Sequence, residues 1–191
     1  MRADAERSTA RILEAAEAVL AVHAGASLER IADEAGLARA TVHRRFASRQ
    51  ALLDALVEQL NQRYARALEQ ARVATAPPVA ALEHVSEIVF ELKITHPFVI
   101  GLDAEQSPEV RAGIELLFAR LRHAGEITAS GSDWCRAVYL SLMTEVHLLP
   151  DDAPDLVAAG SRAALLTKAV LGALRLAGPP CSTRNDDRHS G

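Results

Sequence analysis

Cysteine, aromatic residues and long apolar runs are all rare in this sequence of 191 residues. The two cysteines, Cys135 and Cys181, lie far apart, so neither a disulfide framework nor a C-x-x-C metal or redox motif is available. No apolar run approaches the roughly 18 to 20 residues that cross a bilayer, and the first residues lack the apolar stretch of a secretory signal. We therefore expect a protein of the reducing cytoplasm.

A strong net charge is also missing, which excludes a basic protein that coats nucleic acid. The chain has 21 Lys and Arg against 25 Asp and Glu, for a formal net charge of -4. Residues 1–66 carry ten arginines against nine acids, whereas residues 67–191 carry eleven bases against sixteen acids. Any contact with DNA must therefore be local, and the two parts of the chain are expected to face different partners.

Strand signals are absent, because β-branched residues do not alternate with polar ones. Apolar residues instead recur at every third or fourth position, as on one face of a helix. They make up 49% of the chain, enough for a packed core. The sequence therefore predicts an all-α fold of about nine helices. Their expected ranges are 4–23, 27–35, 39–46, 48–73, 79–96, 98–105, 108–123, 133–149 and 154–176.

Residues 27–46 have the spacing of a helix-turn-helix. Ser27 is placed to cap a short helix, Gly36 can take the left-handed conformation of a sharp turn, and a second helix follows soon afterwards. In that second helix Val42 and Phe46 lie four residues apart and are expected to face inward. Such a unit can place its second helix in a DNA major groove.

The charge of this segment strengthens the interpretation. Between residues 35 and 53 there are four arginines and one histidine but no acid, and such a window favours an anionic partner. Arg44 can read a guanine edge with two hydrogen bonds, Thr41 can contact a base, and Ala40 allows close approach. The alternative is a solvated surface helix, although such faces usually mix both signs.

The helix that follows offers a second contact with DNA. Ser48 is placed to cap it, and its free N–H groups suit a phosphate together with Arg49. Contacts of this kind set the register of a protein on the duplex and carry no sequence information. For His43 the sequence leaves two alternatives open, a phosphate contact or an ordinary surface histidine.

Residues 8–56 resemble the DNA-binding domain of TetR-family transcriptional regulators. The resemblance rests on the run IADEAGL at 31–37 and on TVHRRFASRQAL at 41–52. Family members usually have Ser or Thr where this chain has Ala38, and Lys where it has Arg49; they usually have Tyr at the position of His43. The resemblance implies contacts to bases from Ala40, Thr41 and Arg44, and contacts to the DNA backbone from Ser27, Arg39, His43, Arg45 and Arg49.

The resemblance further implies that the rest of the chain is an all-helical domain that binds a small ligand and forms a homodimer through its last two long helices. Small residues in the final helix permit close helix approach and support the dimer independently. The alternative is that these faces only close the core of one chain. The expected division is a helix-turn-helix domain (1–48), a connecting helix (49–75), a ligand-binding and dimerisation domain (76–177) and a mobile tail (178–191).

The few aromatic residues of the second half indicate where a ligand would bind, since small-molecule sites are mostly apolar with a few polar anchors. Any one of these residues can instead belong to the ordinary core. The expected effector is largely apolar. The candidate ligand-binding residues are Phe90, His96, Phe98, Phe118, Trp134, Tyr139, Met143 and His147.

Signals for a cofactor or for catalysis are weak. His84 and Glu87 lie three residues apart on one expected helix, and Glu145 and His147 lie close on another, but metal sites in helical bundles use more inward-facing acids. No Gly-rich phosphate loop occurs, and nothing places a nucleophile beside a base. We therefore expect no cofactor, no metal and no enzymatic activity.

Together these features predict a ligand-responsive transcriptional repressor. It is expected to bind an inverted-repeat operator in double-stranded DNA as a homodimer, and to be released by a small molecule bound in the C-terminal domain. No contact with a membrane is expected. The alternative, from another class, is a helical-bundle enzyme or metal-binding protein whose N-terminal helix-turn-helix is only structural.

Overall fold

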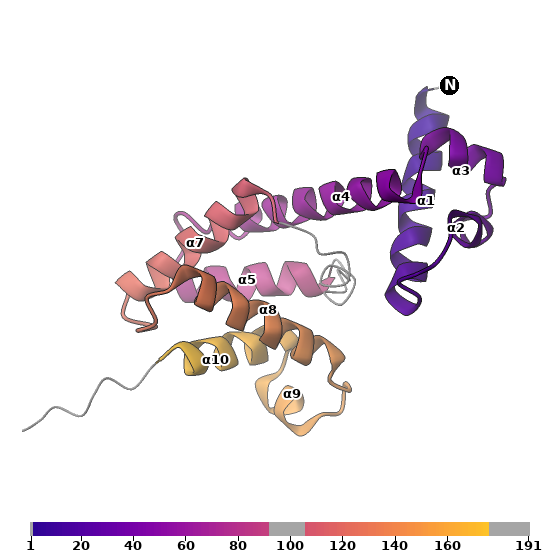
Figure 1. Cartoon of the computed structure of the whole chain (residues 1–191). Helices are drawn as coiled ribbons and strands as arrows, with labels where there is room; N and C mark the ends of the chain where they lie inside the picture. The colour runs from indigo at the N-terminus through magenta and orange to yellow at the C-terminus, as the bar shows by residue number, and fades with distance from the viewer. Residues whose placement is uncertain (1, 92–105, 176–191) are drawn as a thin grey trace, which may run out of the picture.

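The computed structural model describes residues 2–91 and 106–175. These residues form nine helices joined by loops, and they contain no strand (Figure 1). This confirms the prediction of an all-α fold. Within these residues no helix is long and apolar enough to cross a membrane. The helices are α1 (Arg2–Val22), α2 (Leu28–Ala35), α3 (Arg39–Arg45), α4 (Arg49–Gln70), α5 (Pro78–Glu91), α7 (Pro108–His123), α8 (Ser132–Leu148), α9 (Pro154–Ala159) and α10 (Arg162–Leu174).

The first three helices and the start of α4 share a small apolar core. Ile12, Ile31 and Val42 come from three different helices and have no exposed surface. Leu52, from the first turn of α4, closes the same core. The side chains that the apolar spacing placed inward in this part of the chain are buried, which fixes how α3 sits on α1 and α2.

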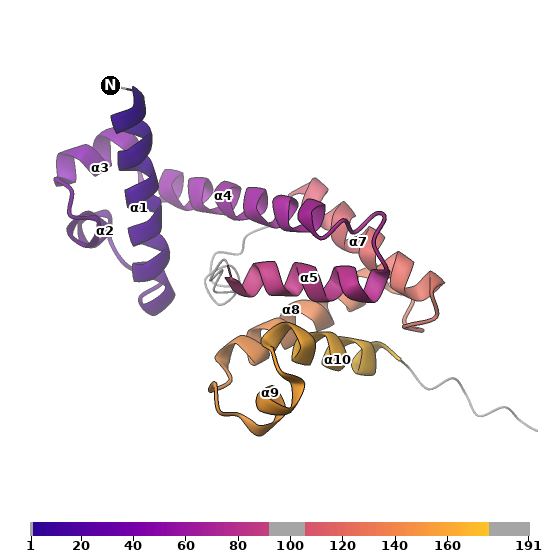
Figure 2. The same ribbon diagram turned by 180° about the vertical axis from the view of Figure 1, so that it is seen from behind.

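A second, larger core lies between the rest of α4 and helices α5, α7, α8 and α10, with α9 at its edge (Figures 1 and 2). Leu82, Leu121 and Leu166 come from α5, α7 and α10 and are fully buried in it. Two buried aromatic rings, Phe118 and Tyr139, meet edge to face with their centroids 6.1 Å apart. Five helices contribute to this core, and it shares no buried residue with the first core.

Helix α4 belongs to both cores. Leu52 and Leu56 pack in the first core, and Leu60 and Leu68 pack in the second. The change of partner takes place between Leu56 and Leu60 within one uninterrupted helix, which both views show as a rod that joins the two bodies (Figures 1 and 2). The position of α3 relative to the second core is therefore transmitted through α4.

Two of the predicted long helices differ from those of the structure. The fourth helix ends at Gln70 and not at Val73, because Arg72 has φ 52° and the N–H of Val73 turns back to the carbonyl of Leu68 at 3.2 Å. The final predicted helix is two helices, since Gly160 has φ 85° and ends α9. Ser161 then caps α10. The predicted piece 98–105 and the tail 178–191 lie outside the described residues.

The turn between α2 and α3 depends on Gly36. This residue has φ 61°, its N–H donates to the carbonyl of Asp33 at 3.2 Å, and the N–H of Leu37 donates to the carbonyl of Ala32 at 3.0 Å. These are the two hydrogen bonds of a helix end that requires a left-handed residue. The Nη2 atom of Arg11 on α1 donates a hydrogen bond to the carbonyl of Ala35 at 2.7 Å, which ties the same turn to α1.

We expect Gly36→Ala to lower the free energy of unfolding by about 1–2 kcal/mol, because a side chain makes the left-handed conformation costly. The new Cβ would also lie 3.3 Å from the Arg11 guanidinium. Chemical denaturation measures the change. Gly25→Ala is the matched control, since nothing lies within 4 Å of a Cβ there and its φ is not positive. Equal effects of the two substitutions would contradict the role given to Gly36.

Candidate functional site

Helix α3 is seated on α2 by its apolar side. Ser27 caps α2 by accepting a hydrogen bond from the N–H of Arg30, whereas Ala38 gives α3 no side-chain cap. Val42 is fully buried and Phe46, at the end of α3, is almost so. The sequence thus uses two apolar residues four positions apart to fix one face of a short helix, and the other face is free to meet a ligand.

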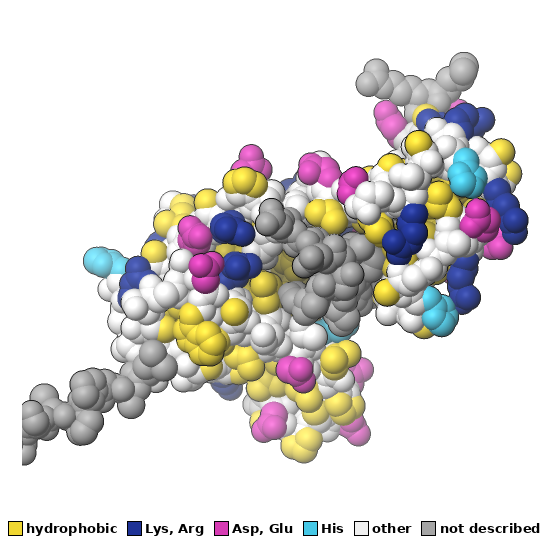
Figure 3. All heavy atoms as spheres, viewed as in Figure 1, with side chains coloured by type: hydrophobic (Ala, Val, Ile, Leu, Met, Phe, Trp, Pro, Cys, Tyr) yellow, Lys and Arg dark blue, Asp and Glu magenta, His cyan; other side chains and the backbone are white. Residues whose placement is uncertain are grey.

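The outer face of α3 is polar and basic. Ala40 and Thr41 lie at its N-terminal end, with Ala40 exposed and Thr41 half-buried. Arg44 and Arg45 are exposed and make no ion pair or hydrogen bond within the part of the chain that the structure describes. Lys and Arg side chains gather on the end of the molecule formed by α1–α3 (Figure 3). This face can bind an anionic surface.

Two other cations of this face are paired with acids of α2. The Arg39 guanidinium lies 4.0 Å from Asp33, and Nε2 of His43 lies 3.6 Å from the carboxylate of Glu29. A hydrogen bond from Ser27 lowers the pKa of Glu29, and His43 makes a smaller contribution in the same direction. All four side chains are largely exposed, so these pairs are weak and exchange readily with phosphate oxygens.

Arg49 does not point outward with the other arginines. Its Nε donates to the carbonyl of Ala26 at 3.1 Å, and its Nη2 donates to the carbonyl of Ala24. Both carbonyls belong to the loop between α1 and α2. Ser48 caps α4 through the N–H of Ala51 at 3.1 Å. The guanidinium predicted to hold a phosphate thus ties α4 to the loop before α2.

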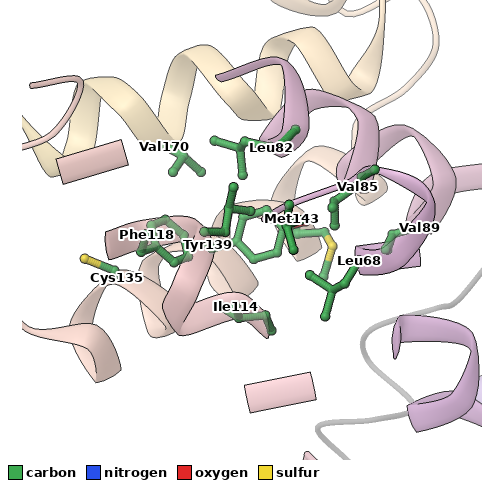
Figure 4. Packing of buried hydrophobic residues seen from close by; sticks show 14 of the residues in the cluster. Leu68, Leu82, Val85, Val89, Ile114, Phe118, Cys135, Tyr139, Met143 and Val170 are labelled. Atoms are coloured by element: carbon green, nitrogen blue, oxygen red, sulfur yellow. The ribbon is translucent and has the colours of Figure 1, made fainter. Parts of the chain in front are cut away.

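The predicted ligand-binding residues fall into three groups. Phe118, Tyr139 and Met143 are buried in the second core, where Figure 4 shows Tyr139 between Phe118 and Met143. Phe118 of α7 and Tyr139 of α8 are thus in ring contact, and their role in ligand binding stays a prediction.

Phe90 and His147 form the second group. Their rings stack with centroids 6.5 Å apart and an interplanar angle of 4°, and both side chains are half-buried. Trp134 stands apart from both groups: it is 56% exposed at the start of α8, and the neighbouring Cys135 takes the inward position instead. Trp134 therefore does not line the second core. His96 and Phe98 lie outside the described residues.

Two hydroxyl groups in the second core escaped the sequence analysis. Ser86 on α5 is fully buried, and its Oγ lies 3.2 Å from the Tyr139 hydroxyl. Tyr64 on α4 is buried, and its hydroxyl has no hydrogen-bond partner among the described residues. Tyr64 lies four residues before Leu68 and four after Leu60 in an apolar stripe, which was the available signal. The spacing of apolar residues gives no corresponding signal for the burial of Ser86.

Burial keeps both tyrosines uncharged. It raises the pKa of Tyr139 to about 12, although the hydrogen bond with Ser86 acts in the opposite direction. Burial also raises the pKa of Tyr64 well above its usual value, and the neighbouring Tyr139 adds to the shift. Each phenol therefore remains a neutral hydrogen-bonding group at physiological pH.

One surface of the second body carries exposed apolar and small residues. On α8 the exposed positions recur at three and four residues, which puts Trp134 and Leu148 on one face of the helix. On α10 the exposed positions include Gly172 and Ala173. Within the described ranges no group of three or more His, Cys, Asp or Glu is placed to hold a metal ion.

A basic recognition helix on a three-helix unit, joined by one continuous helix to a separate helical body, defines a DNA-binding regulator of the helix-turn-helix class. Residues 12–56 match the family described as bacterial regulatory proteins, tetR family. The chain is also 36% identical over 147 residues to the HTH-type transcriptional repressor LfrR of Mycolicibacterium smegmatis, a match that covers 72% of this chain and 76% of that protein. The chain therefore belongs to the TetR family, and it is a transcriptional regulator.

Solved structures agree with this assignment over most of the chain. The TetR-like regulator LfrR from Mycobacterium smegmatis in complex with proflavine has a TM-score of 0.63 at 28% identity, covering 91% of this chain and 98% of that chain. The TetR regulator SCO0520 from Streptomyces coelicolor has a TM-score of 0.55 at 24% identity, covering 89% and 99%, and shares the fold. The proteins named here are regulators, so the helical-bundle enzyme or metal protein is not favoured.

We expect Arg49→Lys to lower the free energy of unfolding by about 1–2 kcal/mol, because a lysine keeps the charge but cannot reach both loop carbonyls with a planar fork. Urea denaturation followed by circular dichroism measures the change. Arg45→Lys is the matched control and should leave the stability unaltered. A variant Arg49→Lys that is as stable as the parent but binds DNA less tightly would assign the residue to a phosphate after all.

Proposed function

We propose that this protein is a cytoplasmic repressor, without enzymatic activity, that binds an inverted-repeat operator as a homodimer and is released by a small molecule. The observation that carries the proposal is the outer face of α3, where Thr41, Arg44 and Arg45 project from a helix seated by Val42 and Phe46. The repressor sense is supported by LfrR, the relative described as a repressor. Residues 1–48 read DNA, 49–75 connect, and 76–177 bind the effector and the second subunit.

In the proposed complex α3 lies in the major groove. Arg44 donates two hydrogen bonds to a guanine, Thr41 contacts a neighbouring base, and Ala40 lets the helix approach closely. The phosphates are bound by residues around this face that are exposed and polar. These are Ser27, Arg39, His43 and Arg45, whereas Arg49 acts by holding the loop before α2.

The dimer uses the exposed faces of α8 and α10. Small residues such as Gly172 and Ala173 permit the close approach that a four-helix interface needs, and Trp134 and Leu148 supply apolar area at its two ends. A two-fold axis through this interface sets the two α3 helices on successive major grooves. Their centres are then about 34 Å apart or a multiple of one turn.

The effector enters the second core between α5, α7 and α8. The residues proposed to line it are Phe90, Phe118, Tyr139, Met143 and His147. LfrR, which shares the fold, has been crystallised with proflavine. An effector that binds the DNA-incompetent state about 100-fold more tightly weakens operator binding by about 2.7 kcal/mol without touching DNA.

Helix α4 carries the coupling between the two sites. Its Arg63 lies 3.0 Å from Glu17 of α1, and its Asn61 accepts a hydrogen bond of 2.9 Å from the N–H of Ser107, which caps α7. A single turn of α4 therefore contacts the DNA-binding unit through Arg63 and the start of α7 through Asn61. A change in the position of α7 reaches α1 through these contacts.

Selection of bound duplexes from a random DNA pool, with the purified full-length protein, tests the proposal. We expect an inverted repeat to be enriched and to bind well above scrambled duplex. Arg44→Ala should then cost about 1–3 kcal/mol of operator affinity and relax the preference at one position of each half-site, because one bidentate base contact is lost.

Arg45→Ala is the matched control for Arg44→Ala. It should weaken operator and scrambled duplex alike and reduce the slope of affinity against salt concentration, as loss of a phosphate contact does. If Arg44→Ala bound both duplexes as the parent does, the assignment of base reading to α3 would be wrong. Failure to enrich any sequence, together with stoichiometric metal in the purified protein, would favour the helical-bundle alternative.

The pair of Glu17 and Arg63 gives a further prediction. Glu17→Ala and Arg63→Ala should each weaken operator binding by roughly 3- to 10-fold, because each removes a contact that fixes α1 against the middle of α4, and the double variant should be no weaker than either one. Fluorescence anisotropy with the selected operator measures all three. Arg66→Ala, on the exposed side of the same helix, is the control. Additive losses would show that the two residues act separately.

A further inference from the structure

The second core differs from the first in that it buries hydroxyl groups. Ser86, Thr167, Tyr64 and Tyr139 are all buried there, on helices α5, α10, α4 and α8. Apart from the two tyrosines, Ser86 and Thr167 are the polar residues that are buried in the described part of the chain. Within the described ranges no Asp, Glu, Lys or Arg residue is buried as a whole, although Nε of Arg136 on α8 is a buried atom.

The protons of the Ser86–Tyr139 pair can be assigned from the contacts. The Ser86 hydroxyl donates its only proton to the carbonyl of Leu82 at 2.8 Å. The 3.2 Å contact between Ser86 and Tyr139 therefore takes its proton from the tyrosine. Tyr139 is thereby satisfied as a donor, and its oxygen keeps the capacity to accept.

Tyr64 is one of two hydroxyl donors without a partner among the buried side chains described here, the other being Thr167. The Tyr64 hydroxyl is buried and unpaired among the described residues. The residue lies one helical turn before Leu68, so the two side chains share a face of α4. Figure 4 shows Leu68 beside Met143, close to the ring of Tyr139. A buried donor without an acceptor costs free energy that a suitable ligand recovers on binding.

We propose that the hydroxyls of Tyr64 and Tyr139 are the polar anchor of the effector site, and that the effector is an uncharged, mostly apolar molecule with a hydrogen-bond acceptor that takes the proton of Tyr64. This inference rests on the proposed function, which places the effector in this core. Both tyrosines belong to a core of apolar side chains that also includes Leu68, Val85 and Met143. A charged ligand would be buried here without a counter-ion from the described residues, which is strongly unfavourable.

Two tricyclic probes of similar size test the proposal on the full-length protein. Acridone is uncharged and carries a carbonyl acceptor, whereas proflavine is a cation at neutral pH. We expect acridone to bind at least about 10-fold more tightly than proflavine in fluorescence titrations. Tyr64→Phe should weaken acridone roughly 3- to 10-fold, the effect of one hydrogen bond, and leave proflavine unchanged.

A second readout does not depend on either probe. Because Tyr64→Phe removes an unpaired buried hydroxyl without changing the shape of the ring, the ligand-free variant should melt about 2–4 °C higher than the parent. Thr167→Val is the matched control: its hydroxyl is also buried and unpaired among the described residues. This control should leave the affinity for acridone unchanged.

Several results would overturn the assignment. They are failure of acridone to bind, equal or tighter binding of proflavine, and an affinity for acridone that Tyr64→Phe does not alter. The proposed function fails by a different measurement: if acridone binds as expected but no operator is enriched from the DNA pool, the anchor stands and the regulatory role does not.

Discussion

The continuity of α4 across two hydrophobic cores is the constraint on which the arrangement depends. Between Leu56 and Leu60 the helix leaves one core and enters the other without a break in its backbone hydrogen bonds. A helix that is packed at both ends cannot change its tilt in one core and keep it in the other. The orientation of the recognition helix is therefore set by the packing of the second core, although no residue of that core needs to approach DNA.

Local charge explains how an acidic protein can offer a surface to DNA. The net charge of -4 belongs to the chain as a whole, whereas the segment 35–53 is free of acids. The acids of α2 lie beside this segment and partner Arg39 and His43, but these pairs are exposed and contribute little. DNA phosphates can replace them at small cost. Arg44 and Arg45 face no such competition among the described residues, so we expect them to contribute more than Arg39 and His43 to the proposed complex.

The features that depend on the spacing of apolar residues could be predicted from the sequence. The features that depend on contacts between distant parts of the chain could not. Helix type and the inward positions of Val42 and Phe46 follow from spacing, and they are confirmed. The sequence predicts a phosphate contact for Arg49, because the free N–H groups at the start of its helix suit a phosphate. Its guanidinium is instead held by two carbonyls that precede it by more than twenty residues in the chain. No local pattern predicts such a contact.

The same limit applies in the second body. Trp134 and Cys135 are adjacent on α8, and the sequence alone favours the larger ring for the core. The structure buries the cysteine, because the inward stripe continues through Tyr139 and Met143 at intervals of four. The sequence predicts one helix over 154–176, but the left-handed backbone of Gly160 ends α9 within that range. In each case the residue type was compatible with both outcomes and the surrounding packing chose between them.

The two cores differ in composition, and the proposed function gives them different tasks. The first core has only to hold α3 at a fixed angle, and its buried residues are all apolar. The second core accepts hydroxyl groups that weaken its packing, including an unpaired tyrosine. A buried polar group of this kind is rarely retained for stability, since an apolar side chain of the same shape would serve better. The unpaired Tyr64 hydroxyl lies in the core against which the second part of α4 packs. It therefore supports the proposal that the packing of this core changes when a ligand supplies an acceptor.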